Sequence, residues 1–212
     1  MNLLNDSLII ITADHGEEFQ EHGRVLHEQV YEELIHVPLI IRMPNAEKPV
    51  KKNLKERLFS LFKEQKEILS VKRIKTLVQH IDIMPTVLDI AGIDKPPYAR
   101  GESLLKVING MSAESTYIFS RNTSGSQYAV RNDTWKLLFF PVENKLVLYN
   151  IVDDPAETMD LSGTEIKTRE KLKRVLFQWK KECEKVRSKS QSDEIELDDT
   201  VKEELKSLGY IE

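Results

Sequence analysis

The fold is decided by the stretch Ser7-Leu-Ile-Ile-Ile-Thr-Ala-Asp-His-Gly-Glu17, in which an apolar run ends in a carboxylate, an imidazole and a glycine. Residues 8–11 show no polar alternation, which is typical of a strand buried on both faces of a parallel sheet. Asp14 and His15 would then lie at the carboxyl end of this strand, where open α/β sheets bind ligands. Gly16 allows the chain to turn, so both side chains can converge on one point.

Asp14 and His15 combine a hard carboxylate oxygen with an imidazole nitrogen, a pair that suits a divalent cation. Two ligands do not make a site, and a strand end with a capping Asp and a surface His is the alternative. Histidines at 15, 22, 27 and 36 could suggest zinc, but the sequence has no His-x-x-x-His pair for a helix face. The Asp-His pair therefore favours an oxygen-rich site.

Composition and charge exclude several classes of protein. The chain has 212 residues, of which 40% are hydrophobic, and its formal net charge of −4 gives no overall case for nucleic-acid binding. The single cysteine, Cys183, excludes an intramolecular disulfide and a cysteine-based zinc site. No stretch has the length of a transmembrane span, and residues 1–12 lack the features of a signal peptide. The sequence leaves the cellular compartment undecided, and the chain taken by itself would be expected in the cytoplasm.

The first half of the chain predicts a βαβ unit followed by an insertion. Residues 37–41 form a second apolar run, and residues 28–34 place Val30, Tyr31 and Leu34 at helical spacing, so we expect a right-handed crossover. Residues 45–75 carry ten Lys or Arg against four Glu, which indicates an inserted basic amphipathic helix. Residues 78–91 predict a core helix that Gly92 ends.

The second half predicts an antiparallel sheet and a long helix. Short apolar runs at 116–121, 126–131, 135–140 and 145–150 are separated by turn residues, which is typical of a meander. Residues 164–189 predict a long charged helix, 188–199 a polar acidic linker and 201–208 a short helix. We therefore expect a partial α/β core over 1–115, a sheet-plus-helix subdomain over 116–190, and a linker with a docking helix over 191–212.

Several motifs follow one another along the chain: Thr12-Ala-Asp-His-Gly-Glu-Glu-Phe19, Glu21-His-Gly23, His27, residues 31–42 with Pro44, residues 78–93, Gly101-Glu-Ser-Leu104, residues 130–137, residues 148–157 and residues 205–210. In order and spacing, these motifs resemble the C-terminal half of a sulfatase of the alkaline phosphatase superfamily. The resemblance implies an α/β fold, the C-terminal part of the mostly parallel sulfatase sandwich, plus a small four-stranded antiparallel sheet and a long C-terminal helix.

The resemblance also assigns roles to individual residues. Asp14 and His15 match the second pair of metal ligands of the family, for Ca²⁺ in the first place and Mg²⁺ or Mn²⁺ as alternatives. His27 matches the position of a group that contacts the sulfate, where many members have Lys, and it would act as a sulfate ligand or proton donor. His22 is a second candidate for substrate binding. His80 and Asp82 are expected to be structural. Arg131 and Lys136 belong to the small sheet that borders the active-site cleft in sulfatases, and we expect them either to support residues of the site or to be structural.

The nucleophile of this family is a formylglycine made from Cys or Ser within a Cys/Ser-x-Pro-x-Arg motif of the N-terminal half, and the present sequence contains no such motif. The resemblance therefore implies that this chain supplies half of an active site. Together with an N-terminal sulfatase half it would hydrolyse a sulfate ester, for example of a sugar or polysaccharide. A phosphonate or phosphodiester hydrolase of the same superfamily, or a non-catalytic remnant, are the alternatives.

Overall fold

The computed structural model describes residues 4–44, 71–111, 117–189 and 198–207. The chain separates into two compact units, Met1–Leu172 and Lys173–Glu212. Most of the predicted basic insertion, the predicted boundary between residues 115 and 116, and most of the acidic linker lie outside the described residues. No described helix is both long and apolar enough to cross a membrane.

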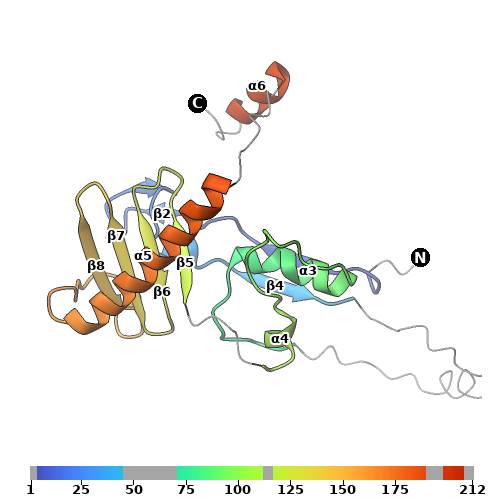
Figure 1. Ribbon diagram of the computed structural model, residues 1–212, viewed down its shortest axis with the longest axis horizontal. Coiled ribbons are helices and arrows are strands. Elements are labelled where there is room, and N and C mark those ends of the chain that lie inside the picture. The colour runs from blue at the N-terminus through green and yellow to red at the C-terminus, as the bar shows by residue number, and fades with distance from the viewer. Residues whose placement is uncertain (1–3, 45–70, 112–116, 190–197, 208–212) are drawn as a thin grey trace, which may run out of the picture. The chain divides into compact units, whose positions relative to one another are not determined.

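A four-stranded antiparallel sheet dominates the first unit (Figure 1). Its strands follow one another in the order β5-β6-β7-β8, which confirms the predicted meander. Their bounds are β5 Ile118–Arg121, β6 Tyr128–Arg131, β7 Trp135–Phe140 and β8 Lys145–Asn150. The β6–β7 turn is tight because the side-chain oxygen of Asn132 accepts hydrogen bonds from the backbone N–H groups of Thr134 and Trp135.

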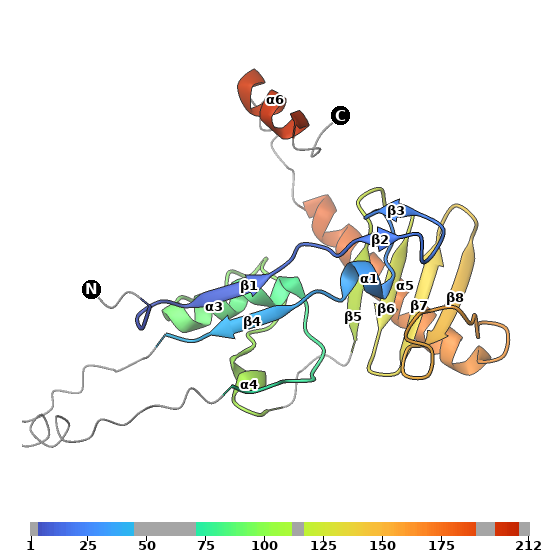
Figure 2. The same ribbon diagram turned by 180° about the vertical axis from the view of Figure 1, so that it is seen from behind.

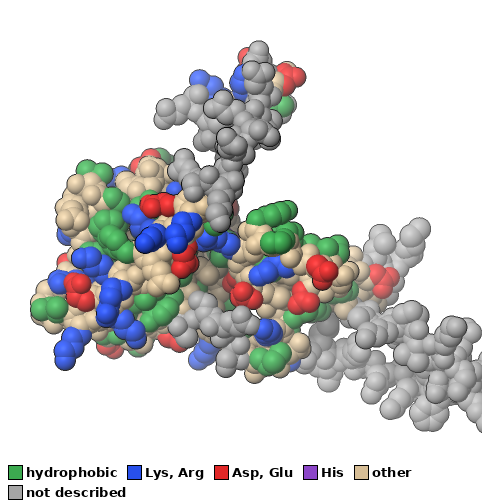
Figure 3. Space-filling view, viewed as in Figure 1, with side chains coloured by type: hydrophobic (Ala, Val, Ile, Leu, Met, Phe, Trp, Pro, Cys, Tyr) green, Lys and Arg blue, Asp and Glu red, His purple; other side chains and the backbone are tan. Residues whose placement is uncertain are grey.

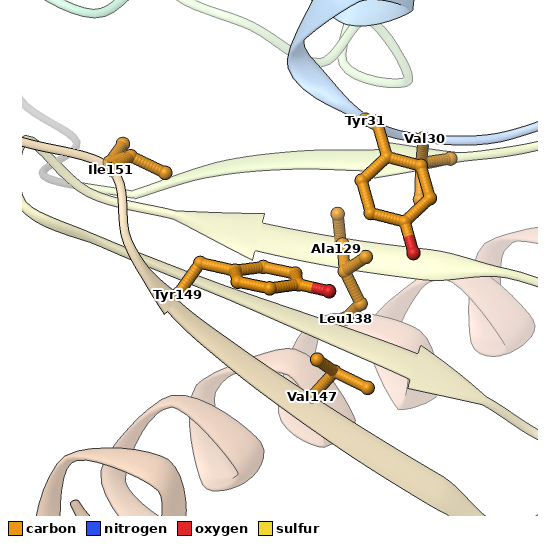
Figure 4. Packing of buried hydrophobic residues seen from close by; sticks show 7 residues of the cluster. All are labelled: Val30, Tyr31, Ala129, Leu138, Val147, Tyr149 and Ile151. Atoms are coloured by element: carbon orange, nitrogen blue, oxygen red, sulfur yellow. The ribbon is translucent and has the colours of Figure 1, made fainter. Parts of the chain in front are cut away.

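The hydrophobic core forms where the N-terminal part of the unit meets this sheet (Figure 4). Val30 and Tyr31 come from the N-terminal part and pack on sheet residues. The sheet residues of this cluster are Ala129, Leu138, Val147, Tyr149 and Ile151. Burying these apolar side chains is the main force that joins the two parts of the unit.

The apolar runs on either side of the Asp-His motif form an antiparallel pair, so the predicted parallel βαβ crossover is wrong. Strand β1 (Ile9–Thr12) pairs with β4 (Leu39–Arg42), with Ile11 opposite Ile40. A parallel pair needs a long crossover connection. Here the connection holds a two-strand hairpin, β2 (Glu18–Phe19) with β3 (Val25–Leu26), and one helical turn, α1 (Glu32–Ile35), shorter than the predicted helix 28–34 (Figure 2).

Residues 71–111 contain short helices whose connecting backbone is fixed by a buried carboxylate, that of Asp82. The helices are a 3₁₀ turn η1 (His80–Asp82), α3 (Ile83–Ala91) and α4 (Leu105–Ile108). The side chain of Asp82 accepts hydrogen bonds from the backbone N–H of Gln79 at 2.8 Å and of Glu102 at 2.9 Å. The predicted structural role of Asp82 is confirmed. Gly92 ends α3 in the left-handed conformation, as predicted.

The predicted long C-terminal helix is present as α5 (Ile166–Lys189), and α6 (Asp199–Ser207) follows it. Helix α5 begins in the first unit and continues into the second. Lys and Arg side chains gather over α5 (Figure 3). Charged side chains on an exposed helix face keep that face hydrated.

Candidate metal-binding site at the end of strand β1

The candidate site begins where strand β1 ends. The carboxylate of Asp14 and the ring of His15 face each other, with 3.7 Å between Oδ2 of Asp14 and Nε2 of His15. The backbone N–H of His15 donates a hydrogen bond of 3.0 Å to Oδ1 of Asp14. The two side chains remain 78% and 41% exposed, respectively, so a ligand can reach both of them.

His15 is held in one tautomer by its neighbour. Its ring Nδ1 lies 2.7 Å from the carbonyl oxygen of Gly16, which can only accept a hydrogen bond. The proton of a neutral His15 therefore sits on Nδ1, and Nε2 keeps a free electron pair on the side of Asp14. A second hydrogen bond of this kind is what orients histidines that bind metal ions.

Gly16 allows the motif to approach helix α1 closely. Its backbone N–H donates a 2.8 Å hydrogen bond to the carbonyl oxygen of Leu34. A Cβ atom at residue 16 would lie 1.8 Å from the carbonyl oxygen of Glu33, so only glycine fits at this contact. The sequence predicted a turn at Gly16, and the structure adds the reason why residue 16 cannot carry a side chain.

His27, which directly follows strand β3, joins this pair at the open end of the β2–β3 hairpin. The ring centroids of His27 and His15 are 4.2 Å apart, and the rings are tilted by 30°. Leu26, directly before His27, has a φ of 78°, a left-handed conformation that is unfavourable for a residue with a side chain. The structure thus brings Asp14, His15 and His27 together, as the sequence predicted for one site.

The donors at this site fit a divalent cation. Hydrogen bonds from the backbone N–H groups of His15 and Asp14 lower the pKa of the Asp14 carboxyl, so it is ionised near neutral pH. An anionic oxygen beside an imidazole nitrogen with a free electron pair is a mixed donor pair that suits Ca²⁺, Mg²⁺ or Mn²⁺ better than a thiolate-seeking metal. Such cations take six or more ligand atoms, so ligands beyond Asp14 and His15 are needed.

His22, the second candidate for substrate binding, lies in different surroundings. Its ring stacks on Tyr31 with 3.5 Å between centroids and an angle of 8°. Its Nε2 lies 3.4 Å from Oε1 of Glu33, and its side chain is only 12% exposed. These contacts hold the β2–β3 hairpin against α1, and a role of His22 in substrate binding stays a prediction.

A buried network of charges beside the site was only partly visible in the sequence. The ammonium group of Lys136, which is fully buried, lies 2.8 Å from Oε1 of Glu157 and 3.1 Å from Oε1 of Glu32. Arg131 forms a further ion pair with Glu32. The signal was Lys136 within the apolar run Trp-Lys-Leu-Leu-Phe-Phe; nothing in the sequence pointed to Glu32 and Glu157 as its partners.

Ligand atoms of His22, Glu33 and Glu157 all lie within 4.8 Å of one another, a spacing that a metal ion could bridge. However, the Lys136 ammonium group already supplies a positive charge at Glu157. Burial raises the pKa of the Glu157 carboxyl, although Lys136 opposes that shift. We therefore interpret this cluster as an ion-pair network rather than a metal site.

Comparison with solved structures defines the class of protein. The structure of BT4656 in complex with D-glucosamine-2-N,6-O-disulfate matches 92% of this chain and 37% of its own, with a TM-score of 0.59 and 25% identity. The phosphonate monoester hydrolase of Agrobacterium radiobacter matches 89% of this chain and 36% of its own, with a TM-score of 0.57, and its 19% identity shows a shared fold alone. The fold is also that of the solved 2-O GAG sulfatase BT1596, with a TM-score of 0.56 and 22% identity, so sulfatases and phosphonate monoester hydrolases share the fold of this chain.

The sequence comparisons identify the family. The family model for the C-terminal region of N-sulphoglucosamine sulphohydrolase matches residues 20–189, and the chain belongs to this family. Arylsulfatase K of Mus musculus is 30% identical over 176 residues, which cover 76% of this chain and 28% of that protein. The chain thus spans less than a third of its curated relative, and the resemblance to sulfatase C-terminal halves is confirmed.

Proposed function

We propose that this chain supplies Asp14 and His15 as ligands of a divalent cation, and His27 as a sulfate-contacting group, to a sulfatase that hydrolyses sulfate esters. The observation that carries the proposal is the convergence of these side chains at the end of β1, with His15 oriented by the carbonyl of Gly16. The bound cation would act as a Lewis acid toward the sulfuryl oxygens.

The residues of the chain have separate tasks in this proposal. Asp14 carries a negative charge that holds the cation, and His15 presents the electron pair of Nε2. His27 is exposed beside His15, where an imidazole can hold a sulfuryl oxygen or give a proton to the leaving alcohol. The sulfated glucosamine bound by BT4656 supports a sulfated sugar as the substrate class.

The nucleophile and the remaining metal ligands are assigned to an N-terminal sulfatase segment, because the present sequence has no Cys/Ser-x-Pro-x-Arg motif. The purified chain alone should therefore show no sulfatase turnover above an Asp14→Ala control. Once it is combined with such a segment, hydrolysis of an aryl sulfate over the matching aryl phosphonate would support a sulfatase. The reverse preference would support a phosphoryl-transferring enzyme, and no hydrolysis of either ester a non-catalytic remnant.

Binding of the cation can be tested on the full chain with Mn²⁺, whose unpaired electrons broaden NMR signals of nearby nuclei. We expect low concentrations of Mn²⁺ to broaden the ring signals of His15 and His27 first, and Asp14→Asn to abolish this selectivity. His36 is the internal control, because its side chain is 75% exposed and lies 4.0 Å from a carboxylate of Glu32. Equal broadening of His36 would indicate unspecific binding and contradict the proposal.

A further inference from the structure

We propose that Lys136 and Glu157 are positioning residues for His15, acting from the four-stranded sheet through helix α1. The inference rests on the proposed function, because it explains how the chain holds a metal ligand whose own surroundings are exposed. Hydrogen bonds and ion pairs connect the buried interior of the sheet to the His15 ring in three steps, each within the first compact unit.

The first step fixes the start of α1. Oε2 of Glu157 accepts a 2.7 Å hydrogen bond from the backbone N–H of Glu32, the first residue of the helix. The side chain of the same Glu32 binds Lys136 and Arg131. Both the backbone and the side chain of Glu32 are therefore held from the sheet side of the unit, by groups that are buried or nearly so.

This anchoring matters because α1 has only four residues. A single turn is not stable by itself, since helix nucleation costs more than one turn of hydrogen bonds returns. Its Ncap residue, Tyr31, makes no side-chain capping hydrogen bond either. The direction of α1 must then be set by its tertiary contacts, which include the network at Glu32 and the packing of Tyr31 and Leu34.

The second step joins α1 to the candidate metal loop. The carbonyl oxygen of Leu34 accepts the hydrogen bond of the Gly16 backbone N–H, and the carbonyl of Glu33 occupies the space where a side chain of residue 16 would be. Gly16 can therefore take only the place that these two carbonyl groups leave for it. A shift of α1 must move the backbone of Gly16 with it.

The third step joins Gly16 to the metal ligand, because the Gly16 carbonyl oxygen accepts a hydrogen bond from Nδ1–H of His15. If Gly16 moves, this hydrogen bond is lost and the proton is free to leave Nδ1 for Nε2. Nε2, the ring nitrogen that faces Asp14, would then carry the proton and no longer offer a free electron pair to a metal ion. The buried ion pairs thereby specify one arrangement of the loop, a role that is separate from any net gain in stability.

The test uses the full chain without metal and reads two local properties, the exchange rate of the Gly16 amide proton and the ¹⁵N shifts of the His15 ring. The double variant Lys136→Met with Glu157→Leu removes one positive and one negative charge, takes away the acceptor of the Glu32 backbone N–H, and leaves Arg131 paired with Glu32. Leu137→Ala is the matched control, because Leu137 is fully buried on the same strand and lies outside the network.

We expect the double variant to speed exchange at Gly16 by about tenfold, as for the loss of one hydrogen-bonded contact, and to shift His15 toward a mixture of tautomers. Leu137→Ala should lower global stability and leave both readouts unchanged at temperatures where the chain is folded. Unchanged readouts in the double variant, or equal changes in both variants, would overturn the inference.

A second variant, Gly16→Ala, breaks the link at its other end and leaves the charged side chains of the network themselves unaltered. It should move the His15 ring shifts as the double variant does, and an unchanged ring would also overturn the inference. Since all these measurements are made without metal, they are independent of the Mn²⁺ titration. If the Mn²⁺ titration fails while the metal-free measurements give the expected results, the proposed function is overturned.

Discussion

The four-stranded sheet and the β1–β4 pair differ in how far the chain completes their surroundings. Leu137, Leu138 and Leu148 of the sheet are fully buried, whereas Ile11 and Ile40, which face each other across β1 and β4, are 56% and 59% exposed. Both regions are rich in apolar residues, but the sheet, whose leucines are fully buried, gains more free energy from removing them from water than the partly buried β1–β4 pair does. The candidate site therefore lies in the less buried region and relies on contacts to the other one.

This difference suits a binding loop. Ligand-binding segments are commonly drawn from the less stable parts of a protein, but metal ligands also need defined orientations. Here the exposed loop with Asp14 and His15 obtains its orientation from Gly16 and α1. Three substitutions would sharpen the contrast between the two regions.

The largest effect is expected for Lys136→Met alone. This change leaves the buried carboxylate of Glu157 without its ammonium partner, and breaking a buried pair from one side typically costs roughly 3–5 kcal/mol of unfolding free energy. Urea denaturation at neutral pH measures the loss. Adding Glu157→Gln should recover much of it, because the unpaired charge is then gone; an equally unstable double variant would show that Lys136 contributes mainly through packing.

A smaller, pH-dependent effect is expected for Glu32→Gln. Burial alone would raise the pKa of the Glu32 carboxyl, but Lys136 and Arg131 outweigh it and lower the pKa below its ordinary value of 4.5. A lowered pKa stabilises the folded chain above pH 4.5, and this stabilisation is lost as the pH falls through the folded-state value. The difference in stability between wild type and Glu32→Gln should therefore narrow below pH 4.5.

The measurement is a series of urea denaturation curves between neutral and acidic pH. Glu143→Gln is the control, because Glu143 is an exposed carboxyl at the turn between β7 and β8. The unfolding free energy of Glu143→Gln should differ from that of the wild type by the same amount at every pH. A constant gap between wild type and Glu32→Gln across the acid range would contradict the assigned ion pairs.

The smallest effect is expected for Ile40→Thr. Thr keeps the β-branched shape that favours strands, and Ile40 is mostly exposed, so the unfolding free energy should change by less than about 0.5 kcal/mol. The matched change in the sheet, Leu138→Ala, should cost roughly 2–5 kcal/mol because Leu138 is fully buried. Similar losses at both positions would refute the contrast between the regions.

Local patterns predicted much of the fold and less of the contacts around the site. The meander was visible because turn residues such as Asn132 separate short apolar runs, and α5 because its periodicity continues over many residues. The strand at Ile9–Thr12 was visible, but its direction relative to β4 was not. An apolar run indicates burial and says nothing about which neighbour pairs with it.

The candidate site shows the same limit. The resemblance to sulfatases pointed to Asp14, His15 and His27, which the structure brings together. The support of His15 could not be predicted, because Glu32 and Glu157 look like ordinary surface carboxylates in the sequence. Their burial arises from the tertiary fold, and a single sequence carries no local sign of which distant residues will contact them.

The bond between Glu32 and Glu157 also has a consequence for the order of folding. It joins residues 125 positions apart, and the bond between Arg131 and Glu32 joins residues 99 apart. Neighbouring strands of the meander are joined by short turns and close small loops, which cost less entropy and form sooner. We therefore expect refolding amides of β6 and β7 to be protected before Gly16, so that the metal loop acquires its shape in the last step.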